Sequence, residues 1–102
     1  MGIENLTHES LTENLNTKFR VTVGEGEPRE IELIEVSEQM RVGAFERFSA
    51  IFRGATDSLL PQGTYSLEHE RLGACELFLV PIAREADGFR YEAVFNRFAQ
   101  EG

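Results

Sequence analysis

The chain has 102 residues, enough for one domain with a single hydrophobic core. Its 18 acidic and 10 basic residues give a net charge of −8, which disfavours binding to nucleic acid or to an anionic membrane. It has no apolar run near the roughly 20 residues that span a bilayer, and it begins with neither the basic nor the apolar part of a signal peptide. We therefore expect a soluble, cytoplasmic protein.

The first predicted element is one short helix over about residues 7–15. Thr7 is a good N-cap, and Leu11 and Leu15 fall four residues apart on one helical face. Leu6 stands just before the cap, at the spacing of a hydrophobic staple with Leu11. A helix this short is marginal alone, so we expect it to dock on the rest of the domain.

Beyond the helix, from about residue 18 to 97, apolar residues recur with a period of two, which indicates strands. A phase slip between Leu33 and Ile34 predicts a β-bulge, or a strand with neither face exposed to water. Residues 38–43 read as a turn. Hairpin signals without a crossover helix favour antiparallel pairing. The sequence thus predicts a single mainly-β domain over 1–102, a small antiparallel six-stranded barrel or sandwich. Its strands are expected at 19–23, 31–36, 45–53, 64–69, 74–82 and 89–95.

The fifth predicted strand has an unusual pattern, because residues 77–80 are four consecutive apolar side chains. Such a run indicates that both faces are covered, as in a central strand or one under the helix. Pro81 lacks an N–H donor and should therefore lie at the end of the strand. Cys75, the only cysteine, lies in the same apolar stretch and is predicted to be a core residue.

The residues that usually carry chemistry do not form a motif. His8 and His69, with one cysteine, complete no zinc set by local spacing. The serines lack the GxSxG context of a nucleophile elbow. Residues 24–26 place a carboxylate where a phosphate-binding loop needs unobstructed backbone N–H groups. We therefore predict no catalytic residue, no cofactor and no metal.

Two apolar segments suit contact with a partner. The loop at 54–63 is long for so small a barrel, and it either plugs the barrel end or meets another protein. The last strand could add to a second sheet if it is an edge; otherwise it closes the barrel. The predicted interaction residues are Leu59, Leu60, Pro61, Tyr91, Val94, Phe95 and Phe98.

Two motifs, Leu-Pro-Gln-Gly-Thr-Tyr at 60–65 and Glu-Leu-Phe-Leu-Val-Pro-Ile at 76–82, are the most specific part of a pattern that covers most of the chain. In this pattern the chain resembles a family of small bacterial domains of unknown function. The resemblance implies a bacterial source and brings no catalytic residue. The resemblance also implies an assembly role, because similar proteins occur near phage-tail-like collar or fibre proteins.

The leading hypothesis is a non-enzymatic protein–protein interaction or assembly module, in a phage-tail-like or other multi-subunit particle. It would bind a protein partner or form a homo-oligomer. The second hypothesis is a small-molecule-binding barrel, with a pocket lined by the aromatic residues Phe48, Phe52, Tyr65, Phe89 and Tyr91. The third is a small hydrolase that uses His69 and a nearby acid.

Overall fold

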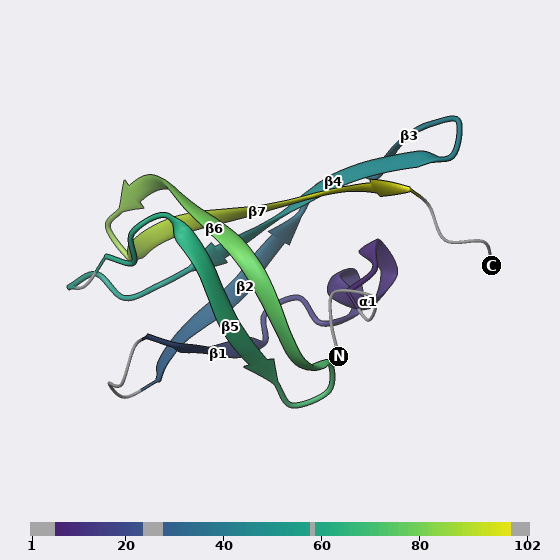
Figure 1. Cartoon of the computed structure of the whole chain (residues 1–102). Helices are drawn as coiled ribbons and strands as arrows, with labels where there is room; N and C mark the ends of the chain where they lie inside the picture. Colours follow the sequence, from purple (N-terminus) through teal and green to yellow (C-terminus); the bar gives the residue numbers. More distant parts are fainter. Residues whose placement is uncertain (1–5, 24–27, 58, 99–102) are drawn as a thin grey trace.

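The computed structural model describes residues 6–23, 28–57 and 59–98. In these ranges the chain forms one short helix and seven strands in a single antiparallel sheet (Figure 1). The strand order is β2-β1-β5-β6-β7-β4-β3, and a further pairing of β2 with β4 closes six strands into a barrel. The predicted six-stranded barrel with one helix near the N-terminus is confirmed. The elements are α1 (His8–Glu13), β1 (Lys18–Thr22), β2 (Arg29–Val36), β3 (Met40–Val42), β4 (Phe45–Arg53), β5 (Gly63–His69), β6 (Gly73–Glu85) and β7 (Gly88–Phe98).

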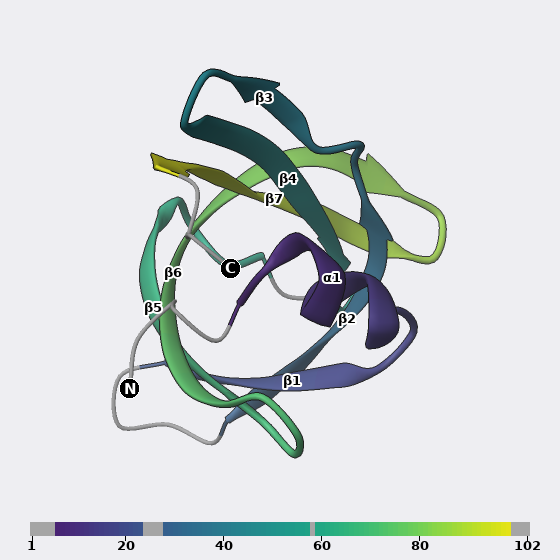
Figure 2. The ribbon, with the colours of Figure 1, turned by 90° about the vertical axis from the view of Figure 1, so that its right-hand side faces the viewer.

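Helix α1 begins as the sequence predicts, with Thr7 as its N-cap. The Thr7 side chain accepts the backbone N–H of Ser10 at 3.0 Å, and Ser10 Oγ accepts the N–H of Thr7 at 2.9 Å. Leu6 and Leu11 are both fully buried in the core, as a hydrophobic staple requires. The helix ends at Glu13, earlier than predicted. It lies in front of the ring of strands and closes that end of the barrel (Figure 2).

The bulge predicted in the second strand is present. Leu33 pairs with Phe52 and Glu35 pairs with Ile51, so Ile34 is the additional residue between them. An extra residue bends a strand and increases its twist. This bend lies where β2 returns to β4 and closes the barrel.

Two predictions about β6 were wrong. Its side chains alternate, with Cys75, Leu77 and Leu79 buried and Phe78 half exposed, so only the inner face is covered. The barrel wall is a single layer, and no second layer of the described chain covers Phe78. Pro81 lies inside the strand, which continues to Glu85. The pairing of β6 with β5 ends before it, at Leu79, and a register shift toward β7 follows it.

Side chains fill the interior of the barrel. The rings of Phe19 and Phe52 meet edge to face with centroids 5.3 Å apart, and those of Phe48 and Phe95 stack at 4.7 Å. Of the five aromatic residues proposed to line a pocket, Phe48, Phe52 and Tyr91 are buried in this core, and Tyr65 and Phe89 pack against it. These aromatic side chains therefore form the core.

Part of the segment 38–43, where a turn was expected, is the short strand β3. Met40 pairs with Arg47, and Val42 pairs with Phe45. β3 bonds only to β4 and lies outside the ring of six. Its three residues are all exposed, so their pattern carried no burial signal.

Strands β4 and β7 extend beyond the ring. They pair over nine positions, from Phe45–Phe98 to Arg53–Arg90, whereas β6 pairs with β7 only as far as Val80–Glu92. The far ends of β4 and β7, together with β3, form a three-stranded projection (Figure 1). We call this projection the arm; it comprises residues 40–49 and 93–98.

Candidate functional site

The predicted interaction residues of the long loop are divided between core and surface. Leu60 is buried, and its backbone N–H donates to the hydroxyl of Tyr91 at 2.9 Å. Leu59 is half exposed and Pro61 is exposed. The loop therefore packs on the barrel through Leu60, which leaves no surface at that residue for a partner.

β7 closes the barrel over its first part, whereas residues 93–98 pair only with β4 and so form an edge of the arm within the described residues. From Gly88 to Glu92 it pairs with β6 on one side, and it pairs with β4 from Arg90 to Phe98. Tyr91 and Phe95 are buried in the core, so they cannot contact a partner. Val94 lies on the outer side. The backbone of Phe98 pairs with Phe45, and its side chain is outside the described part of the chain.

One face of the arm carries exposed apolar side chains. Directly paired residues share a face of a sheet, and so do residues two apart on one strand. Val42 is paired with Phe45, Met40 with Arg47, and Val94 with Ser49, so all of these lie on the outer face. The exposed fractions are 64% for Met40, 78% for Val42, 37% for Phe45 and 50% for Val94. We call the outer face of the arm, which carries these four side chains and Arg47, the arm face.

The arm is basic in a chain whose net charge is −8. It holds Arg41, Arg47 and Arg97 against a single acid, Glu46. Arg41 and Arg97 both contact Glu46, at 3.9 and 3.0 Å, on the side opposite the arm face. Arg47 is exposed on the arm face, and no carboxylate of the described residues pairs with it. The arm face thus combines apolar side chains with one available guanidinium.

The inner face of the arm is anchored to the N-terminal segment. Glu46 is buried and accepts hydrogen bonds from Gln39 Nε2 at 2.6 Å and from Arg97 Nε at 3.0 Å. Arg97 also donates to the carbonyl of Leu6 and lies over the rings of Phe48 and Phe95. These contacts fix the arm's position, so its outer face is presented on a rigid support. Glu46 falls in phase with the inward side chains of β4, but an acid in a strand usually faces solvent, so it was missed.

His69, the residue that a hydrolase would use, has both ring nitrogens occupied. Nδ1 accepts the backbone N–H groups of Arg71 and Leu72 at 3.0 and 3.1 Å. Nε2 lies 2.8 Å from Thr17 Oγ1, which itself donates to the carbonyl of Asn14. Burial, and to a lesser extent the charge of Arg71, lowers the pKa of His69. The residue lines a surface hollow of about 630 Å³, but it holds a turn there. No group of three or more metal-ligating side chains occurs in the described ranges.

A second hollow, of about 560 Å³, lies between the loop and β2. Leu60, Tyr91 and Arg29 are among its lining residues. Burial raises the pKa of the Tyr91 hydroxyl. That hydroxyl already accepts the Leu60 N–H, and it therefore serves to hold the loop.

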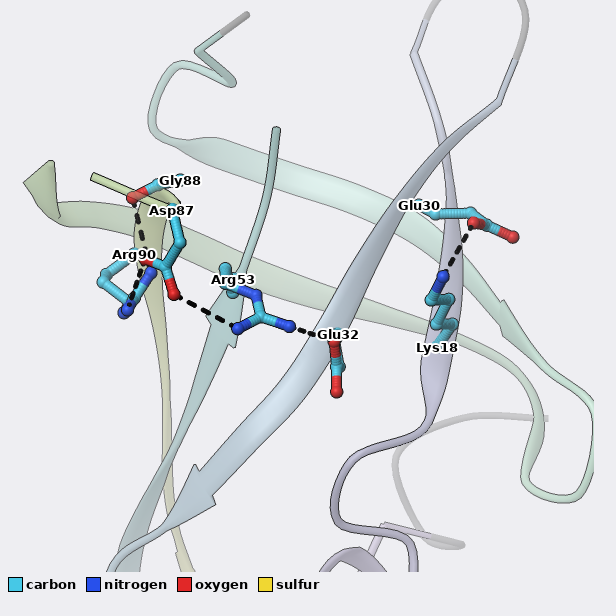
Figure 3. A network of polar contacts seen from close by, with 7 residues as sticks. All are labelled: Lys18, Glu30, Glu32, Arg53, Asp87, Gly88 and Arg90. Atoms are coloured by element: carbon cyan, nitrogen blue, oxygen red, sulfur yellow. Dashed lines mark hydrogen bonds and ion pairs between the residues drawn. The ribbon is translucent and has the colours of Figure 1, made fainter. Parts of the chain in front are cut away.

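An ion-pair network lies at the end of β4 opposite the arm. Figure 3 shows this network from close by. Arg53 on β4 bonds Glu32 on β2 and Asp87 in the β6–β7 turn, and Arg90 bonds Asp87 at 2.9 Å. Contact with Glu32, more than with Asp87, raises the pKa of Arg53. The hydrogen bond from Arg90 is the main cause that lowers the pKa of Asp87. The network bridges the strands at the seam where the barrel closes.

The fold and these surfaces define a small closed β-barrel with a projecting three-stranded arm. The chain belongs to the family described as Domain of unknown function (DUF6916), whose profile matches residues 6–95. No curated protein and no solved structure matches the chain. Among the described residues, no helix has the length and apolar character needed to cross a membrane.

Proposed function

We propose that this domain is a non-enzymatic interaction module that contacts other protein subunits of a multi-subunit particle through the arm face. The observation that supports this proposal is the cluster of exposed Met40, Val42, Phe45 and Val94 side chains on one face of the arm. Met40, Val42 and Phe45 adjoin one another on this face, and Val94 lies farther along it, opposite Ser49. Exposed apolar side chains gathered on one face are unfavourable in water and mark interaction surfaces. A phage-tail-like particle is the setting that the family resemblance suggests for such a module.

The anchoring of the arm favours the same role. A surface that is already held in one conformation loses little conformational entropy when a partner binds. The Glu46–Arg97 contact and the Phe48–Phe95 stack provide this support from the inner face. Full burial of one exposed Val or Phe side chain contributes about 1.5–3 kcal/mol. A few such side chains, together with Arg47, are enough for a specific contact.

The other two hypotheses have less support. An internal ligand would need space that the packed aromatic side chains occupy. A hydrolase would need His69 as a base, yet both of its nitrogens are engaged in hydrogen bonds to the protein.

A photo-crosslinking amino acid placed at Val42 tests the proposal in cells that produce the protein. We expect one discrete crosslinked product (an adduct) at Val42, identified by mass spectrometry. Its yield should fall when Met40→Ser is added. The matched control position is Leu59, which is also exposed and apolar but lies on the long loop. If Val42 and Leu59 give the same diffuse adducts, the arm face is not a contact surface and the proposal fails.

A further inference from the structure

A second exposed apolar strip lies on the outer side of β6. Phe78 and Ile82 are each 49% exposed, and Val80 between them is partly exposed. Two carboxylates stand beside this strip: Glu76 lies two residues before Phe78, and Glu92 on β7 is paired with Val80. We call the three apolar residues and the two acids the β6 face.

Neither acid of the β6 face has a cationic partner among the described residues. The ion pairs of the described chain involve other carboxylates, such as Glu68 with Arg20 and Glu32 with Arg53. The β6 face is therefore apolar and negative. The arm face is apolar and carries the positive charge of Arg47.

The two faces also match in spacing. Phe45 and Arg47 are two residues apart on one side of β4, and Phe78 and Glu76 are two residues apart on one side of β6. Two residues along a strand span roughly 6.8 Å. One face can therefore place an aromatic ring and a charge opposite an aromatic ring and the opposite charge on the other.

We propose that the arm face of one copy of the chain packs on the β6 face of a second copy, with Arg47 opposite Glu76. This inference rests on the proposed function and names the partner at the same site. The apolar side chains provide most of the affinity, and the charge pair fixes the register and excludes wrong partners. Because every copy carries both faces, the contact can repeat from copy to copy, as an assembly module requires.

A charge-swap experiment tests this contact by sedimentation velocity over a wide range of protein concentration. Arg47→Glu places two acids at the contact, and Glu76→Arg places two arginines there. We expect each variant alone to self-associate about tenfold more weakly than the wild type. We expect an equal mixture of the two variants to associate again, because every contact between unlike copies then joins opposite charges.

Matched controls separate this effect from the change in net charge. Arg71→Glu and Glu70→Arg make the same charge changes on the exposed β5–β6 turn, away from both faces. We expect these controls to associate as the wild type does, alone and when mixed. Arg47 and Glu76 are exposed, so the variants should fold, which thermal unfolding will verify.

The outcomes distinguish the inference from the proposed function. A wild type that stays monomeric throughout, or a mixture that associates no better than its components, overturns the contact between copies. If the Val42 adduct forms and contains a different protein, the proposed function stands, but a second copy of the chain is not the partner of the arm face. If neither the adduct nor self-association occurs, both fail.

Discussion

The Nε2 atom of His69 lies 2.8 Å from the Oγ1 atom of Thr17, a residue 52 positions earlier in the sequence. Thr17 gives its own hydroxyl hydrogen to the carbonyl of Asn14, so the Oγ1 atom must accept a hydrogen from Nε2. Nδ1 then carries no hydrogen, in agreement with the two backbone N–H groups that it accepts. His69 is thus a neutral imidazole that ties the β5–β6 turn to the segment after α1.

This arrangement predicts a dependence of stability on pH. The pKa of His69 is lowered in the folded state, so the unfolded chain binds the extra proton first as the pH falls. The contribution of His69 to stability is therefore complete above about pH 6.5, the usual value for an unfolded histidine. It is lost as the pH falls from there through the lowered folded pKa.

Urea unfolding between pH 8 and pH 5 will measure this effect, with His69→Asn as the comparison. Asparagine keeps an acceptor near the position of Nδ1 but does not titrate. We expect the wild type to lose more stability than the variant over this range. Equal pH slopes for the two proteins would show that His69 does not titrate on unfolding.

The parts of the fold that depend on local pattern were predictable. Thr7 and Leu6 marked the helix start, and the slip between Leu33 and Ile34 marked the bulge. Phe78 shows where such reasoning fails. A run of four apolar residues has the same appearance whether its outer side chains lie under a second layer or on an open surface.

The candidate surfaces depend on pairing between distant strands, which the sequence pattern does not show. Among the predicted interaction residues whose side chains are described, Val94 alone lies on the arm face. Met40 and Val42 were missed because they lie in a strand of only three residues. Their shared face became visible only through their register with β4.

The buried ion pair of the arm should contribute far more to stability than an exposed pair. Glu46→Ala removes the carboxylate that Arg97 contacts and leaves a largely buried guanidinium without it. Removing one partner of a buried pair costs about 3–5 kcal/mol. Glu68→Ala, the control, breaks the exposed pair with Arg20 and should cost less than about 1 kcal/mol. Urea unfolding of both variants measures the difference, and equal losses would contradict the role assigned to Glu46.

Gly88 should tolerate substitution much less than Gly43. Gly88 has φ of +142°, and a Cβ there would overlap the carbonyl oxygen of Gly54. Gly43, at the arm tip, has φ of +63° with open space around it. We expect Gly43→Ala to cost about 1 kcal/mol and Gly88→Ala to cost more than about 3 kcal/mol. Thermal unfolding compares the two, and a mild effect at Gly88 would show that the β6–β7 turn can move away from Gly54.

The hydroxyl of Tyr91 should control how firmly the long loop is held. Tyr91→Phe keeps the buried ring but leaves the N–H of Leu60 without its acceptor. An unsatisfied buried donor costs about 1–3 kcal/mol. The control is Tyr65→Phe, which removes an exposed hydrogen bond to Pro61 in the same loop. Hydrogen exchange at the Leu60 amide should accelerate in Tyr91→Phe and stay near the wild-type rate in Tyr65→Phe. If both variants leave that rate unchanged, the loop is held by the packing of Leu60 in the core, and the hydroxyl is not needed.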